Sequence, residues 1–147
     1  MKSIVICASL NPETHNTLKS ITSKIDLQHA QVFIVHVFEI QFATTEITAM
    51  AYPSADQYPE IEKSIMQTLD KIATSLALPE KTLVIKKCIF SHSREAALKD
   101  YLKEVNAEMV VVATRGKHGI AGLFSSSMTD FLCKYSPCDV LVLRPQH

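Results

Sequence analysis

Hydrophobic residues recur along this chain in two alternating patterns. Short apolar runs alternate with segments in which apolar residues return at every third or fourth position. The first pattern is typical of buried strands and the second of amphipathic helices. Their alternation predicts an α/β fold, in which helices cover both faces of an open parallel sheet. The runs expected to form strands are residues 4–8, 32–38, 83–89, 109–113 and 140–143.

Helix signals occupy the intervals between these runs. Asn11, Pro12 and Glu13 supply a cap, a first-turn proline and an acidic residue, and the apolar positions of the helix that they begin continue through Ile25. A strict three-and-four spacing predicts a helix over 58–77. Ser93 is expected to cap a helix that runs to about residue 105. A short helix is expected over 127–135.

Two segments lack a simple pattern, and both bear on assembly. Residues 40–57 have no clean period and exceed an ordinary connection, so we interpret them as a mobile excursion. The strand at 83–89 contains two lysines, which suits a sheet edge. The last strand is an apolar edge and predicts a homodimer through residues 140–144. The alternative is that segment 40–57 covers this edge.

Composition restricts the possible partners. Fifteen basic and fifteen acidic residues balance to a formal net charge of zero, which argues against binding to nucleic acid or to an anionic membrane. The apolar runs are too short to span a membrane, and no signal segment precedes the first strand, so we expect one cytoplasmic domain over 1–147. The four cysteines have no C-x-x-C spacing, which favours buried reduced thiols over a zinc site with His118, Cys133 and Cys138.

Glycine is confined to one place in this chain. Gly116, Gly119 and Gly122 directly follow the strand at 109–113 and precede three serines at 125–127. Main chain without side chains, followed by a helix start, can bring N–H groups close to an anion, and three cationic side chains lie in the same segment: Arg115, Lys117 and His118. The spacing is not a Walker P-loop. The alternative is a tight turn, with Ser127 and Asp130 forming a capping box.

The residues around these glycines resemble the C-terminal half of a universal stress protein domain. The resemblance lies in the runs Val110–Gly119, Ser126–Ser127 and Ser136–Arg144, and it extends to the first strand, to His36–Val37 and to the total length. It implies a doubly wound five-stranded sheet of order 3-2-1-4-5. It also implies pairing into a dimer, with ATP bound in some members of the family and absent in others.

The family's ATP pattern, Gly-x2-Gly-x9-Gly followed by Ser or Thr, is matched only in part. Its four positions fall on Ala113, Gly116, Ser126 and Ser127, of which two match. The family's aspartate, which holds the sugar side of the nucleotide, falls on Ser9, and the adenine-packing position falls on Val37. We expect these departures to weaken binding by roughly one to three powers of ten, without abolishing it.

We therefore predict a stress-response module that binds an adenine nucleotide (ATP, ADP or AMP, with Mg as an accompanying ion) and is not an enzyme. The alternatives are a dimer that has lost the nucleotide and acts through protein contacts, and a phosphohydrolase or kinase, for which the chain shows no nucleophile and base set. The predicted nucleotide-binding residues are Ala8, Ser9, Val37, Val112, Ala113, Arg115, Gly116, Lys117, His118, Gly119, Ser126, Ser127 and Met128.

Overall fold

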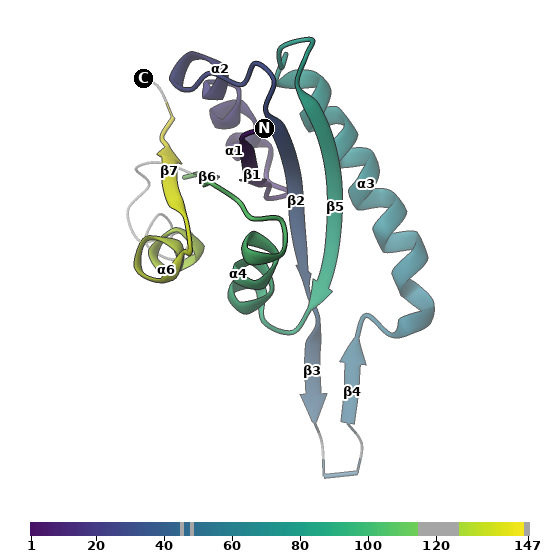
Figure 1. Ribbon diagram of the computed structural model, residues 1–147. Coiled ribbons are helices and arrows are strands. Elements are labelled where there is room, and N and C mark those ends of the chain that lie inside the picture. Colours follow the sequence, from purple (N-terminus) through teal and green to yellow (C-terminus); the bar gives the residue numbers. More distant parts are fainter. Residues whose placement is uncertain (45, 48, 115–126, 146–147) are drawn as a thin grey trace.

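The computed structural model describes residues 1–44, 46–47, 49–114 and 127–145, and of Ser127 it describes the backbone only. Five parallel strands form one sheet in the order β5-β2-β1-β6-β7, as Figure 1 shows. Numbered along the chain within this sheet, the order is 3-2-1-4-5, which confirms the predicted fold. The strands are β1 (Ser3–Cys7), β2 (Gln31–Glu39), β5 (Leu83–Ser91), β6 (Met109–Ala113) and β7 (Asp139–Leu143).

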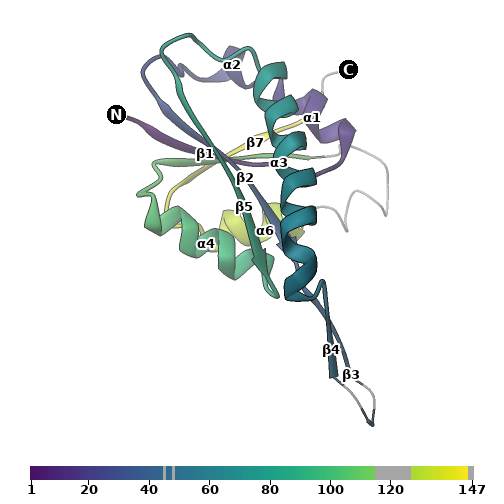
Figure 2. The ribbon, with the colours of Figure 1, turned by 90° about the vertical axis from the view of Figure 1, so that its right-hand side faces the viewer.

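The helices cover both faces of this sheet (Figure 2). One face packs against α1 (Pro12–Leu18), α2 (Ile21–Lys24) and α3 (Tyr58–Ser75), and the other against α4 (Arg94–Glu104) and α6 (Ser127–Tyr135). Alternate residues of β2 divide between the two faces, since Val32 and Ile34 join the first apolar cluster and Phe33 and Val35 the second. The central strands β1, β2 and β6 are therefore buried on both sides, which explains their continuous apolar runs.

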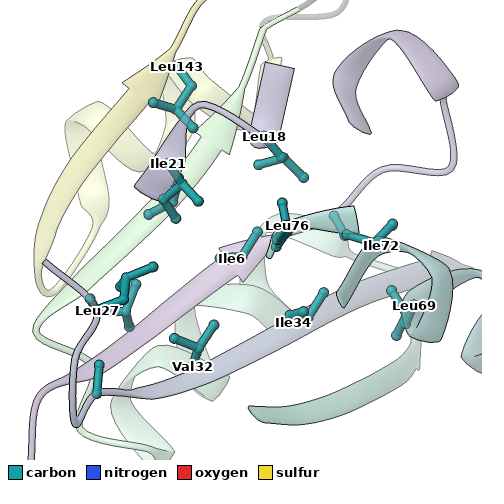
Figure 3. Packing of buried hydrophobic residues seen from close by; sticks show 14 of the residues in the cluster. Ile6, Leu18, Ile21, Leu27, Val32, Ile34, Leu69, Ile72, Leu76 and Leu143 are labelled. Carbon is teal, nitrogen blue, oxygen red and sulfur yellow. The ribbon is translucent and has the colours of Figure 1, made fainter. Parts of the chain in front are cut away.

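The core on the α3 face shows how the helix period fits the sheet. Leu69 and Ile72, three residues apart on α3, lie over Ile34 of β2 (Figure 3), and all three side chains are at most 2% exposed. Burying such a side chain contributes about 1.5–3 kcal/mol. The predicted helix over 58–77 is confirmed, with its last helical residue at Ser75.

The helix predicted after β1 is two helices instead of one. Asn11 caps α1 as expected, its side chain accepting a hydrogen bond from the Glu13 N–H at 2.8 Å. The helix then ends at Leu18 and α2 begins at Ile21. The hydroxyl of Ser20 donates to the carbonyl of Thr17 at 2.9 Å, and such side-chain bonds to nearby carbonyls compete with continued helix.

The segment 40–57, interpreted from the sequence as a mobile excursion, contains regular structure that its lack of a period did not predict. Strands β3 (Gln41–Thr44) and β4 (Ala49–Tyr52) pair as an antiparallel hairpin, followed by a 3-10 turn at Ala55–Gln57. The hairpin extends beyond the end of β2, away from β7 (Figure 1). It therefore does not cover the β7 edge. The other edge strand is β5, as its lysines predicted.

Candidate functional site

The first strand and the strand before the glycines lie side by side, as the sequence predicted. β1 and β6 pair in parallel, with Ile4 opposite Met109 and Ile6 opposite Val111. The next strand along the chain from β1, which is β2, lies on its other side, so the sheet changes its direction of winding between β1 and β6. Ligands of open α/β sheets bind at such a point, outside the carboxyl ends of the strands. We call this place the carboxyl-end crevice. It is bounded by Ala8–Ser9, which follow β1, and by Ala113, the last residue of β6, with Thr114 after it.

One side of the crevice is formed by β2 and β5, which are longer than β1. The last pair between β1 and β2 is Cys7 with Val35, whereas β2 and β5 remain paired as far as Glu39 and Ser91. Four further residues of β2, at about 3.3 Å each, extend roughly 13 Å beyond β1. The β2–β5 pair therefore continues past the end of β1 at the side of the crevice.

His36 is the first residue of this extension, and it ties β2 to the end of β1. Its Nδ1 lies 2.8 Å from the carbonyl oxygen of Ala8. Burial lowers the pKa of His36 below its usual value, the hydrogen bond to Ala8 acts in the opposite direction, and the positive charge of Arg94 lowers it further. The ring is therefore neutral at pH 7, with Nδ1–H donating to the Ala8 carbonyl.

A polar network fixes the turn that follows β1. The Thr14 hydroxyl donates to the Asn11 carbonyl at 2.7 Å, so the hydroxyl of Ser9 must donate to the oxygen of Thr14. The Ser9 oxygen also accepts the N–H of Asn11 at 3.2 Å, and His15 Nε2 lies 2.7 Å from the Ser9 carbonyl. The one proton of the Ser9 hydroxyl is thus in use, and only its remaining lone pair can accept a hydrogen bond from a ligand.

The structure brings part of the predicted site together. Ala8 and Ser9 follow β1, and Ala113 ends β6, beside them at the crevice. Val37 and Val112 are at most 5% exposed and pack in the second apolar cluster, which Met128 of α6 joins while partly buried. Ser127 begins α6 as expected. Six predicted residues lie outside the described part of the chain: Arg115, Gly116, Lys117, His118, Gly119 and Ser126.

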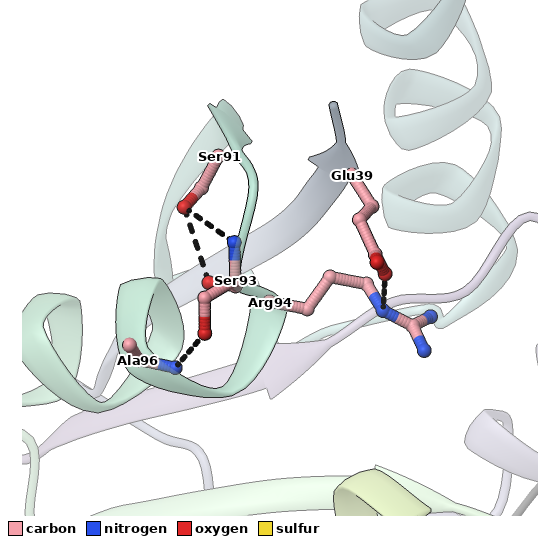
Figure 4. A network of polar contacts seen from close by, with 5 residues as sticks. All are labelled: Glu39, Ser91, Ser93, Arg94 and Ala96. Carbon is pink, nitrogen blue, oxygen red and sulfur yellow. Dashed lines mark hydrogen bonds and ion pairs between the residues drawn. The ribbon is translucent and has the colours of Figure 1, made fainter. Parts of the chain in front are cut away.

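Sequence reasoning missed an ion pair at the carboxyl end of β2. Glu39, the last residue of β2, accepts a bond at 2.9 Å from Nε of Arg94, the first residue of α4 (Figure 4). Ser93 holds the start of α4, since its side chain accepts from the Ala96 N–H at 3.3 Å. The charge of Arg94 also reaches Cys7 and His36. An acidic residue after the second strand of a nucleotide-binding fold was the available signal, because such residues hold ribose hydroxyls in dinucleotide-binding domains.

An open groove of about 470 Å³ lies elsewhere on the surface, between β5 and α4. Its lining is mixed, with Lys87, Asp100 and Glu104 beside Ile89 and Tyr101. It includes none of the predicted nucleotide-binding residues, so the groove is distinct from the carboxyl-end crevice.

The cysteines differ in exposure more than the sequence predicted. All four are free thiols, and burial raises the pKa of Cys7 and Cys88 to about 11. Cys133 is exposed, so the expectation of a buried thiol is wrong there, because it occupies the outer side of α6. Within the described residues, no three His, Cys, Asp or Glu side chains are grouped to hold a metal ion. No helix in that same part of the chain is long and apolar enough to cross a membrane.

Comparison with known proteins agrees with the fold. The model of the universal stress protein family matches residues 1–144. A universal stress protein solved in complex with cAMP superposes with a TM-score of 0.64 at 15% identity, covering 97% of this chain and 96% of the other. UspA from Lactobacillus plantarum gives 0.66 at 14% identity, with 97% of each chain covered.

A third solved structure, the Archaeoglobus fulgidus universal stress protein in complex with dAMP, gives a TM-score of 0.61 at 12% identity and covers 97% of this chain and 98% of the other. None of the curated proteins compared with the chain matches it in sequence. The family model spans nearly the whole sequence, and the strand order is the one the resemblance implied. The chain belongs to the universal stress protein family.

Proposed function

We propose that this protein is a stress-response module that binds an adenine nucleotide weakly in the carboxyl-end crevice. The observation that supports this most is the pairing of β1 with β6, which sets Ser9 and Ala113 at one edge, directly before the glycine segment. The solved universal stress proteins with cAMP and dAMP show that relatives of this fold hold adenine nucleotides.

The proposed roles follow from the chemistry of each residue. Backbone N–H groups near Gly116, Ser126 and Ser127 bind phosphate, with Arg115 adding positive charge and Mg accompanying a triphosphate. Val37 is the family's adenine-packing position, and its side chain, 5% exposed within the second apolar cluster, offers only a small surface to the base. Ser9 accepts a hydrogen bond from a ribose hydroxyl, because its own hydroxyl hydrogen is donated in a hydrogen bond to Thr14. A neutral serine accepts less strongly than the aspartate of the family's pattern, which is one reason to expect weak binding.

The described residues fit a nucleotide only in part. Ala113 places a methyl group at the end of β6 where the family's pattern has glycine, while Ser9 keeps one free lone pair toward a ligand. Restoring the missing residues should therefore strengthen binding. We expect Ala113→Gly combined with Ser126→Gly to lower the Kd for ATP, ADP or AMP by roughly ten- to a thousandfold.

The test is a thermal-shift and calorimetric titration of the wild type and of this double variant. A ligand at a hundred times its Kd adds about 2.7 kcal/mol to the free energy of unfolding. The control is Ala55→Gly, an exposed alanine in the 3-10 turn far along the chain from β6, which should leave nucleotide affinity unchanged. The absence of any shift in both wild type and double variant would reject nucleotide binding.

One observation favours the alternative of a dimer without nucleotide. The Ser9 hydroxyl is already used twice within the protein, so the turn after β1 is complete without a ligand. Mass spectrometry of small molecules released from freshly purified, denatured protein separates the two functions. Gly116→Val distinguishes them further, because it removes a ligand response only if there is one.

We also propose a cellular location, a mode of assembly and the lack of a catalytic role. The protein is cytoplasmic and pairs through residues 140–144, and light scattering that finds a monomer at tens of micromolar would contradict that dimer. We infer no catalytic role. An ATPase activity that disappears in His118→Ala would overturn this inference.

A further inference from the structure

The hairpin of β3 and β4 exposes large apolar side chains. Every residue of both strands is exposed, and the exposed fractions reach 64% for Phe42, 68% for Met50 and 58% for Tyr52. A two-stranded hairpin with nothing packed on it is marginally stable in water, and grouped exposed apolar residues mark interaction sites.

The register of the hairpin separates its two faces. Ala43 lies opposite Met50 and Gln41 opposite Tyr52, so these four share one face, while Phe42 lies on the other. Phe42 has a partner, since its ring centroid is 5.8 Å from that of His92. Within the described part of the chain, the side chains of Met50 and Tyr52 have no hydrogen bond or ring contact. We call the surface formed by Ala43, Met50 and Tyr52 the hairpin patch.

The base of the hairpin is held firmly against the sheet. The N–H of Ile40, between β2 and β3, donates to the Ser91 carbonyl at 2.8 Å. After β4 the ring of Tyr58 stacks on Phe90, with centroids 4.3 Å apart and planes within 5°, and Phe38 lies 5.5 Å from the same ring. The hairpin therefore projects away from the body of the molecule (Figures 1 and 2), and the residues of its patch are exposed.

We propose that the hairpin patch packs face to face on the hairpin patch of a second copy of this chain, about a two-fold axis. Ala43 and Met50 are cross-strand neighbours, so the patch has a small residue beside a large one. A two-fold rotation sets the Met50 side chain of each copy over Ala43 of the partner subunit. The same surface then serves both subunits, as an isologous contact requires.

Charge favours a second copy over a strongly charged partner. Residues 40–53 contain a single charged side chain, Glu46, so the hairpin offers nothing to attract a strongly charged protein. The whole chain has a formal net charge of zero and a sequence pI near 7.0. Two copies therefore do not repel each other at neutral pH, where proteins near zero net charge associate most readily.

The size of the patch indicates a weak contact. A large side chain such as Tyr52 buries about 150–250 Å² at most, and a standard interface buries about 800 Å² on each partner. The patch thus supplies only part of a stable interface. We expect association that grows with protein concentration, as one step beyond whatever assembly the β7 edge provides.

The test compares two lysine substitutions in the same hairpin. Met50→Lys places a charge in the patch, whereas Thr44→Lys places the same charge on the opposite face. Light scattering and sedimentation velocity from micromolar to near-millimolar protein should show a rising mass for the wild type and Thr44→Lys. For Met50→Lys the mass at the highest concentration should be that of the assembly formed without the hairpin contact. Ala43→Arg should behave like Met50→Lys.

Circular dichroism should show all variants folded, since all three positions are exposed in the monomer. A wild-type mass independent of concentration would overturn the proposal, as would equal behaviour of the two lysine variants. Binding of the patch to another protein, without self-association of the wild type, would also overturn the choice of a second copy.

Discussion

The turn after β1 and the β3–β4 hairpin differ in which groups they bury and which they expose. The turn holds polar groups in a partly buried place, and its hydroxyls, its amide and the two histidine rings beside it are paired within the protein. The hairpin places apolar groups in water, and the face that carries Met50 and Tyr52 has no ring contact with any described residue of the monomer. Unpaired buried polar groups destabilise a fold directly, whereas exposed apolar groups are tolerated until a surface covers them. The turn therefore contributes to stability, and the hairpin is available for association.

The comparison predicts the largest effect for Thr14→Val. The variant keeps the shape of this 5%-exposed side chain but removes the oxygen that receives the Ser9 proton and the donor to the Asn11 carbonyl. We expect the free energy of unfolding to fall by about 2 kcal/mol, as measured by urea denaturation.

Thr17→Val is the matched control for that variant. Thr17 is also buried, but among the described residues its hydroxyl bonds only the Glu13 carbonyl of its own helix. Its replacement should cost about 0.5 kcal/mol. Equal losses for the two threonine variants would mean that the network around Ser9 has no special energetic role.

A smaller effect, dependent on pH, is expected at His36. Its pKa is lowered in the folded state, so the unfolded chain binds the proton more readily. The unfolding free energy of the wild type should be at its full value above pH about 6.5 and should fall as the pH drops below it. His36→Asn keeps a donor toward the Ala8 carbonyl but cannot titrate.

Urea denaturation of both proteins from about pH 7.5 to about pH 5.5 checks this expectation. The advantage of the wild type over His36→Asn should shrink toward the acidic end. An advantage that grew on acidification would contradict the assignment of a neutral His36. Arg94→Gln should make the decline smaller, because without the Arg94 charge the folded-state pKa of His36 lies closer to its unfolded-state value.

The smallest effect on stability is expected in the hairpin. Phe42→Ala removes an exposed ring whose ring contact is with His92, and the free energy of unfolding should change by less than about 0.5 kcal/mol. Hydrogen exchange should show the β3 and β4 amides exchanging well before those of β1 and β2 in dilute protein. Strong protection of the hairpin amides in a monomer would remove the contrast between the two regions.

The hydrophobic pattern predicted the sheet because its central strands are buried on both faces, so every residue of Val32–Val35 had to be apolar. The same pattern could not predict the hairpin, because strands exposed on both faces need no alternation. The break between α1 and α2 coincides with a hydrogen bond from the Ser20 hydroxyl to the Thr17 carbonyl. The sequence pattern does not show whether this bond forms.

The candidate site was predictable to a similar, partial extent. The position of Ser9 and Ala113 followed from the strand order, which the resemblance implied. The sequence did not distinguish Thr14 from an ordinary helix residue. Its role is to accept a hydrogen bond from the Ser9 hydroxyl, which lies five residues earlier in the turn. The Glu39–Arg94 pair joins two elements whose approach no local pattern encodes.

Strand β2 carries a consequence for signalling. Its middle residues line the core, His36 touches the end of β1, Glu39 holds Arg94, and the chain then continues directly into the hairpin. If the crevice binds a nucleotide as proposed, a ligand that twists this strand would reorient the hairpin, and a second copy bound to the hairpin would change the affinity of the crevice by the same free energy. One continuous segment of main chain would then link the two proposed binding places mechanically.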